Sequence, residues 1–312
     1  MTRLAGELSE RAAAGAVLAG AVLWGTVGAA QELGAANAQP FTVAAVRSVG
    51  AAIALPALLL SMGRGRALLT ALVAAPGRML ASGLSIAVFQ VALLTGIRGA
   101  GVALGTLLAI GSSPAWAGGF AVVTGHPPGR RWLVSTVLTM VGAAVLLLLG
   151  TDGGSAHEAG ATPTMSGVVA SLVAGAAYAT YATLAKRILE LGATGPGLVA
   201  VVFVVAGLAL APLLAVGDSG WVASQPGGVT AVWLTLTTAG GYLLFARGLR
   251  RLDAPKVTTL TLAEPLTATV LALVVVGERL TGAGLVGALL LLAGLVLVST
   301  RSAAMPDRHR GA

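Results

Sequence analysis

The hydrophobic positions of the chain form long runs that are separated by short polar segments. A helix needs about 20 apolar residues to cross the hydrocarbon core of a bilayer. Ten runs have about that length and are predicted to be membrane-spanning helices, at 12–31, 41–61, 79–97, 100–122, 131–150, 166–185, 197–216, 229–246, 256–277 and 282–300. A transmembrane barrel would instead show alternating segments of about 10 residues. The pattern predicts an all-α integral membrane protein with ten transmembrane helices.

The polar segments predict how these helices are oriented, because Lys and Arg accumulate in cytoplasmic loops. With a cytoplasmic N-terminus, sixteen Lys and Arg residues fall in cytoplasmic segments, and only Arg98 and Arg279 fall in outer segments. A missed or additional span would invert every later loop and remove this bias. The first run is too long for the apolar core of a signal peptide, and no clear cleavage site follows it. We therefore expect a multi-pass protein of the cytoplasmic (plasma) membrane with both termini in the cytoplasm.

A weak internal repeat relates the two halves of the chain. A shift of 152 residues aligns Gly96 with Gly248 and Gly142 with Gly294, and a slightly different shift aligns Trp24 with Tyr178. Each half holds five spans, so the halves have opposite orientations, as in the inverted repeats of secondary transporters. We expect two inverted five-helix repeats, at 1–150 and 166–300, with an outer linker at 151–165 and a cytoplasmic tail at 301–312.

Composition agrees with a membrane protein and excludes several functions. The chain is 56% hydrophobic and 10% charged, whereas soluble domains carry about 25% charged residues. The net charge of +8 is spread over clusters between the spans, which indicates membrane topology rather than a nucleic-acid partner. The chain has no cysteine, and its three histidines are scattered, so neither a thiolate site nor a histidine metal site is expected. No nucleophile or nucleotide-binding motif is present, so we expect no enzyme, no catalytic residue and no cofactor.

The stretch from Lys256 to Ser299 carries a specific set of motifs. Leu-Ala-Glu-Pro at 262–265 is followed by Gly-Glu-Arg-Leu-Thr at 277–281 and by Gly287 and Gly294. This order resembles the EamA family of the drug/metabolite transporter (DMT) superfamily, and the resemblance extends to Leu-Trp-Gly at 23–25. The first half departs from the family pattern at 125–128, where Gly-His-Pro-Pro lacks the usual acidic residue. The resemblance implies a secondary transporter of small metabolites, amino acids among them, with a cavity between its two halves.

Two charged residues lie inside predicted spans, where a charge is costly. Arg47 is about 9 Å deep from the outer face, and Glu264 is about 12 Å deep from the inner face, at a rise of 1.5 Å per residue. Glu264 is interpreted either as a proton-coupling or cation-binding group, since burial favours the neutral carboxyl, or as a structural acid beside Pro265. Arg47 is interpreted either as an anchor for an anion and partner of Glu264, or as a side chain that extends to the outer interface.

Aromatic and amide side chains are the remaining candidates for a cavity lining. They are Trp24, Gln90, Tyr178, Tyr181 and Tyr242; packing or interface anchoring is the alternative for each. Pro265 and Pro114 are predicted to bend their helices, because proline removes a backbone donor. Pro114 follows two serines, so the acid before the proline occurs in one half only.

These observations favour a transporter that moves a small metabolite, an amino acid or related compound, in the export direction by alternating access. The partners would be the lipid bilayer, a small-molecule substrate and, through Glu264, a proton. The alternative is a non-transporting membrane scaffold or regulatory subunit, because close Gly and Ala packing serves either function. Glu264 argues against a scaffold, which has little use for an acid in hydrocarbon. The sequence leaves the oligomeric state open.

Overall fold

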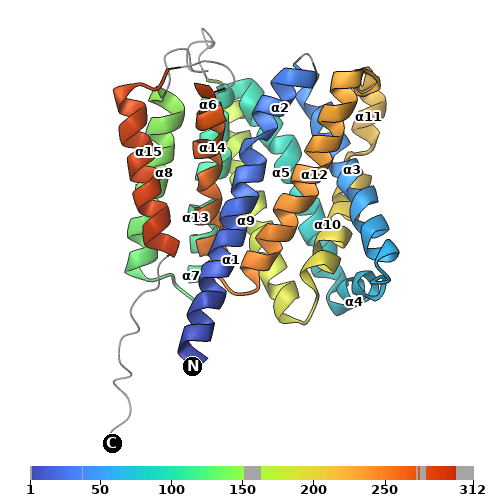
Figure 1. Ribbon diagram of the computed structural model, residues 1–312, viewed down its shortest axis with the longest axis horizontal. Helices are drawn as coiled ribbons and strands as arrows, with labels where there is room; N and C mark the ends of the chain where they lie inside the picture. Colours follow the sequence, from blue (N-terminus) through green and yellow to red (C-terminus); the bar gives the residue numbers. More distant parts are fainter. Residues whose placement is uncertain (1, 37, 151–162, 272, 275–278, 300–312) are drawn as a thin grey trace, which may run out of the picture.

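The computed structural model describes residues 2–36, 38–150, 163–271, 273–274 and 279–299. Within these ranges the chain forms helices and no β-strand, so the predicted all-helical architecture is confirmed (Figure 1). Nine helical segments of the described chain are long and apolar enough to cross a membrane. Most of the predicted linker at 151–165 and the whole predicted tail at 301–312 lie outside the described residues.

The regular elements follow one another as helices with short interruptions. They are α1 (Thr2–Gly25), α2 (Val27–Gly34), α3 (Pro40–Ser61), α4 (Arg66–Ala74), α5 (Pro76–Ala100), α6 (Val102–Thr106), the π-turn η1 (Leu107–Gly111), α7 (Ser113–Val123), α8 (Arg130–Leu149), α9 (Met165–Glu190), α10 (Gly195–Leu210), α11 (Pro212–Val216), the 3-10 turn η2 (Gly220–Ala223), α12 (Gln225–Leu249), α13 (Ala254–Leu260), the 3-10 turn η3 (Thr261–Ala263), α14 (Glu264–Leu271) and α15 (Gly282–Ser299).

The predicted span over 256–277 is helical in its described part, with an irregular turn next to the predicted bend at Pro265. The chain forms α13, tightens into η3, and resumes as α14 at Glu264. Pro265 is the second residue of α14, and a proline has no N–H to bond to the preceding turn. The backbone therefore breaks just before the proline, and residues 272 and 275–277 of the predicted run lie outside the described chain.

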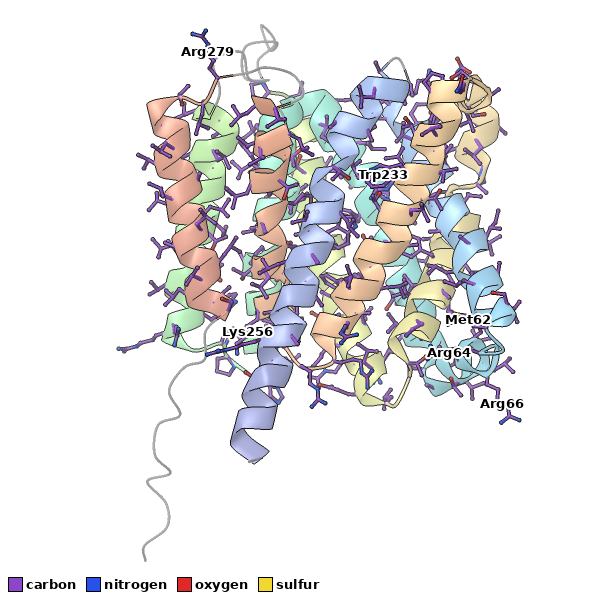
Figure 2. The ribbon with its side chains drawn as sticks, viewed as in Figure 1. Met62, Arg64, Arg66, Trp233, Lys256 and Arg279 are labelled. Carbon is purple, nitrogen blue, oxygen red and sulfur yellow. The ribbon has the colours of Figure 1, made fainter. Side chains whose placement is uncertain are left out.

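Several charged side chains lie at the two ends of the helices. Figure 2 shows Arg64, Arg66 and Lys256 at the end where α1 begins and α15 finishes, here called the basic end, and Arg279 at the opposite end. The helix bounds place Arg98 at the opposite end as well, in the last turn of α5. These cations thus lie at the two ends of the helices, with the apolar bundle between them.

Helices of the first half pack mainly against helices of the second half. The most extensive pairs are α5 with α9, α8 with α15, α3 with α10, and α1 with α12. Glycine permits the close approach of α8 and α15: a Cβ on Gly287 would come within 2.7 Å of the Leu146 nitrogen and 3.0 Å of the Gly142 oxygen. Small residues at such contacts let helix backbones touch in a membrane, so the two halves interlock.

Candidate functional site

Six of the seven polar and aromatic candidates line one small cavity between the helices. This central cavity measures about 70 Å³, and its lining includes Trp24, Arg47, Gln90, Tyr178, Tyr242 and Glu264. The remaining lining residues are Val27, Phe89, Leu93, Ile110 and Thr261. These side chains come from both halves of the chain, so the fold brings together residues that are more than 200 positions apart in the sequence.

The break in the helix places Glu264 at the cavity. Glu264 starts α14 directly after η3, and it is partly buried while Pro265 is buried. The end of α1 fixes this point, because a Cβ on Gly25 would come within 2.9 Å of the Glu264 backbone oxygen and 2.5 Å of Thr267 Cβ. Within the described residues, no hydrogen bond or ion pair of the Glu264 carboxylate is found. The carboxylate is therefore available to a solute in the cavity.

Arg47 is held inside the bundle from the opposite wall. Its Nε donates a hydrogen bond of 2.8 Å to Oγ1 of Thr238, a fully buried residue of α12. This contact favours the interior interpretation of Arg47 over a side chain that extends to the interface. Arg47 and Glu264 form no ion pair with each other in the described structure. The two opposite charges face one cavity without neutralising each other through direct contact.

Aromatic rings form much of the remaining wall. The ring centroids of Trp24 and Tyr242 are 4.9 Å apart, and those of Phe89 and Tyr178 are 5.2 Å apart. Tyr181 is fully buried and stacks on Phe245 at 5.7 Å. It belongs to the aromatic packing behind the cavity and does not line it.

Several buried donors in this region have no acceptor among the described residues, among them Nε1 of Trp24 and Nε2 of Gln90. A buried polar group without a partner costs about 1–3 kcal/mol, and buried polar groups in proteins are generally bonded to protein, water or a ligand. Both residues line the central cavity, so a solute with acceptor atoms would satisfy them.

Pro114 is the counterpart of Pro265 in the first half, and it is not a lining residue. It is buried in the first turn of α7, directly after the π-turn η1. The Ser113 hydroxyl donates 2.7 Å to the Ile110 carbonyl, and Ile110 itself lines the cavity. The first half therefore contributes an apolar side chain at its helix break, whereas the second half contributes an acid.

Sequence reasoning missed several cavity residues. Phe89, Ile110 and Leu93 are apolar side chains in apolar helices, and nothing in the sequence distinguishes them from lipid-facing neighbours. Thr238 was missed for a similar reason, since a threonine in a membrane helix usually bonds its own backbone. Only the tertiary packing selects them.

Comparison with known proteins assigns the family. A model of the EamA-like transporter family matches twice, at residues 11–148 and 165–300. The chain belongs to the EamA-like transporter family. It is also 33% identical over 287 residues to the Uncharacterized transporter YwfM of Bacillus subtilis (strain 168). The aligned region covers 91% of this chain and 92% of the relative. The predicted membership of the DMT superfamily is thereby confirmed.

A solved crystal structure shares the fold of this EamA-like chain. It superposes with a TM-score of 0.74 at 17% identity, over 92% of this chain and 96% of the other. At that identity the likeness concerns the fold alone. Together with the nine apolar helices of the described residues, the family establishes a multi-pass membrane protein.

Proposed function

We propose that this protein is a secondary transporter that exports a small zwitterionic metabolite, an amino acid or a related compound, across the cytoplasmic membrane. The observation that carries the proposal is the central cavity, where Arg47 and Glu264 face the same space without pairing in the described structure. Membrane-embedded ionisable residues mark substrate or ion pathways as a rule. Family membership supports transport as the activity.

The charges of the cavity suit a solute with both an acidic and a basic group. The guanidinium of Arg47 would take the carboxylate, since Arg binds carboxylates through a planar fork of donors. The Glu264 carboxylate would take the ammonium group, and Trp24 Nε1 and Gln90 Nε2 would donate to remaining acceptors. The rings of Phe89 and Tyr178 offer an apolar surface to a side chain. Each of these polar groups thereby gains a partner.

The size of the cavity supports a mechanism with a conformational change. A volume of about 70 Å³ holds a few waters, whereas ligand sites typically measure about 300–1,000 Å³. The helices must therefore separate to admit the solute. We propose that the two halves, as inverted five-helix repeats at 1–150 and 166–300, rock about the cavity and expose it to each side in turn.

The pairing of helices supports this inverted repeat and a tenth span. The pair α1 with α12 joins the first span of one half to the third span of the other, and the pair α9 with α5 does the same with the halves exchanged. The broken segment α13–η3–α14 occupies the place of the fourth span in the second half. The basic end would face the cytoplasm, in accord with the distribution of Lys and Arg.

Glu264 would couple export to proton entry. In each cycle the carboxylate takes up one proton from the outer side after the solute has left, and releases it to the cytoplasm before the next solute binds, so that one proton enters for each solute exported. A protonated carboxyl is tolerated in a low-dielectric cavity, and an ionised one is stabilised when the solute's ammonium group is present. The solute and the proton would thus occupy Glu264 alternately.

Substrate-dependent proton movement in proteoliposomes tests the proposal. Vesicles loaded with a pH-sensitive dye would be screened against amino acids and related metabolites, with wild type beside Glu264→Gln. Asp218→Asn is the matched control, because Asp218 is an exposed acid that accepts from the Gly220 backbone at 2.8 Å, away from the cavity. A pH change that needs the solute, survives in the control and disappears in Glu264→Gln is expected. Solute flux that persists without Glu264 would reject the coupling role, and neither flux nor binding of any compound would favour a scaffold.

A further inference from the structure

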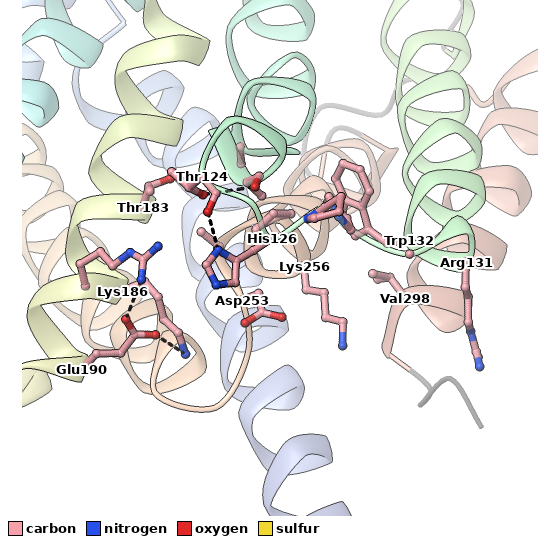
Figure 3. Close-up of a pocket in the computed structure, with 18 of the residues that line it drawn as sticks. Thr124, His126, Arg131, Trp132, Thr183, Lys186, Glu190, Asp253, Lys256 and Val298 are labelled. Carbon is pink, nitrogen blue, oxygen red and sulfur yellow. Dashed lines mark hydrogen bonds and ion pairs between the residues drawn. The ribbon is translucent and has the colours of Figure 1, made fainter. Parts of the chain in front are cut away.

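A larger pocket lies at the basic end, apart from the central cavity. It measures about 490 Å³ and is built by the end of α7 and the segment after it, the start of α8, the end of α9, the start of α13 and the end of α15. Figure 3 shows Lys186, Lys256, Trp132, Asp253 and His126 around this space. We call it the basic-end pocket. Its volume lies in the usual range of sites for small organic ligands.

Cations outnumber acids in the lining of this pocket. The lining has four basic residues of the Lys and Arg type and two acidic residues; these are Lys186, Arg187, Arg131 and Lys256, and Glu190 and Asp253. Glu190 already lies 3.6 Å from Arg187 and 3.9 Å from Lys186, and Lys186 also donates 2.9 Å to the Leu249 carbonyl. Lys256 has no ion pair within the described ranges, although Asp253 is one turn away. Its ammonium group therefore remains available to an anion in the basic-end pocket.

Trp132 adds a directed donor to this charge. Its Nε1 is buried and has no acceptor in the part of the chain that the structure describes. The indole ring is held in place, because a Cβ on Gly118 would come within 3.0 Å of Trp132 Cζ3. Apolar residues, among them Ala117, Ala121 and Val298, complete the wall. A buried N–H, an available ammonium group and an apolar wall are the elements that recognise an organic anion.

The basic-end pocket and the central cavity share two walls. On α9, Thr183 lines the pocket and Tyr178 lines the cavity, about 7.5 Å apart along the helix axis. On the second wall, Lys256 of α13 lines the pocket and Thr261 of η3 lines the cavity. Beside this wall lie the buried hydroxyls of Thr136 and Thr259, which are hydrogen-bonded at 3.0 Å. A short step of one or two helical turns therefore separates the two spaces.

We propose that the basic-end pocket is a second binding site, which takes a small organic carboxylate with an apolar body before it reaches the central cavity. Lys256 neutralises the carboxylate, Trp132 Nε1 donates to it, and the apolar wall contacts the rest of the solute. Movement of the solute from the pocket to the central cavity rests on the proposed function, whereas binding of the solute in the pocket does not require transport. The inference adds to the proposed function a class of solute and a place where that solute is first selected.

The local potential of the pocket is measured first, through thiol labelling. The chain has no cysteine, so Thr183→Cys introduces a single thiol on the pocket wall. Met62→Cys is the control, an exposed position at the basic end near Arg64 and outside the pocket. Charge focused in a cleft is expected to favour anionic sulfonatoethyl methanethiosulfonate over its trimethylammonioethyl analogue by about tenfold at the pocket thiol relative to the control thiol. Lys256→Gln should remove most of this preference. Equal preferences at the two positions would overturn the proposal.

Protection from labelling then tests binding itself. Phenylacetate serves as the probe and neutral phenylacetamide as its control, with purified protein in phosphatidylcholine vesicles. Phenylacetate is expected to slow labelling of the Thr183→Cys variant severalfold and to leave the Met62→Cys variant unaffected, while phenylacetamide has no effect on either. Lys256→Gln and, separately, Trp132→Phe should each weaken the protection. Failure of phenylacetate to protect the pocket thiol in protein that still labels would overturn the proposal.

Two further arms separate the alternatives. If added phosphatidylglycerol protects the pocket thiol and phenylacetate does not, the pocket holds a lipid headgroup and the proposal is wrong. Flux is measured on the same vesicles. Flux without protection would reject the second site and leave the proposed function standing, whereas protection without flux would support the site and count against the proposed function.

Discussion

The helices that lead to Pro114 in the first half and to Pro265 in the second half are interrupted in opposite ways. Before Pro114 the backbone widens into the π-turn η1, and before Pro265 it tightens into the 3-10 turn η3. Both interruptions lie next to the central cavity, where they present Ile110 and Glu264. A non-helical backbone at membrane depth is tolerated only where protein or a cavity surrounds it. In each half, the backbone before the proline thus departs from regular α-helical geometry next to the cavity.

The difference between the two breaks lies in what the side chain before the proline does. Ser113 turns back on its own helix and donates to the Ile110 carbonyl at 2.7 Å. Glu264 has no such local partner in the described residues and faces the cavity. At the first break the polar side chain bonds to its own helix, and at the second break the carboxylate remains available to a solute in the cavity. The comparison teaches that both halves can keep an irregular turn beside the cavity while only one half supplies an ionisable side chain there.

The largest effect is expected from removing the polar group at each break. Glu264→Gln should reduce substrate-dependent proton movement to background, because an amide cannot exchange a proton near neutral pH. Ser113→Ala should retain most of it, since it removes only a local hydrogen bond of about 1 kcal/mol. Both are read in dye-loaded proteoliposomes. Equal losses in the two variants would mean that the breaks act through shape alone.

A close glycine contact at the second break is expected to have the next largest effect. Gly25→Ala would bring a Cβ to within 2.9 Å of the Glu264 oxygen, and such overpacking costs about 1–3 kcal/mol. The melting temperature in detergent should fall accordingly. Gly28→Ala is the matched control, because no described atom lies within 4 Å of a Cβ at that position. If both variants melt like wild type, the end of α1 does not fix the break.

Replacing the two prolines should separate the breaks by a smaller margin. Pro265→Ala restores a backbone donor, and conversion of the three residues of η3 from 3-10 to α geometry would turn Glu264 by about 60°. We expect the transport rate to fall about fivefold, or ~1 kcal/mol in activation free energy. Pro114→Ala turns only apolar Ile110 and should change the rate less than about twofold. Initial rates of solute flux decide between these outcomes, and an equal effect of both prolines would contradict the comparison.

The smallest effect is expected from the hydroxyl pair that joins α13 to α8. Thr136→Val removes its 3.0 Å bond to Thr259, which keeps a second bond of 2.8 Å to the Pro255 carbonyl. Bonds between membrane helices contribute about 0.6 kcal/mol on average. A double-mutant cycle with Thr259→Val, followed by thermal unfolding, should give a coupling energy of that size. Additive effects of the two substitutions would show that the pair contributes no coupling.

The sequence predicted the helical spans well because their signal is local. An apolar run of membrane length has one stable form in lipid, since every backbone group must be bonded within the segment. Nine of the ten predicted runs overlap the apolar helices of the described residues. The tenth, at 256–277, was predicted as a span with a bend at Pro265, because hydropathy gives the length of a span and proline marks a place where its helix can bend. Pro265 indicated a bend, but it did not indicate that the three residues of η3 before Glu264 take the 3-10 form.

The site was accessible to sequence reasoning only through its unusual residues. Arg47, Glu264, Gln90 and the aromatic candidates stood out because polar and aromatic groups are exceptional in apolar helices. Six of the seven candidates line one cavity, while Tyr181, on the same helix face as Tyr178, packs against Phe245 instead. The basic-end pocket gave no such signal. Its cations were interpreted as markers of topology, and only the fold shows that Lys256 and Trp132 share a cavity.

The interlocked glycine faces of α8 and α15 also concern the order in which the protein is made. Ribosomes deliver the N-terminal half first, so α8 enters the bilayer long before α15 exists. Until then Gly142 offers lipid a groove that is shaped for another backbone, because its partner Gly287 is 145 residues away. Until α15 has been synthesised, this face of α8 has no partner helix and is open to contact with chaperones, proteases and other nascent chains. The close contact of Gly142 and Gly287 can therefore form only after the second half has been synthesised.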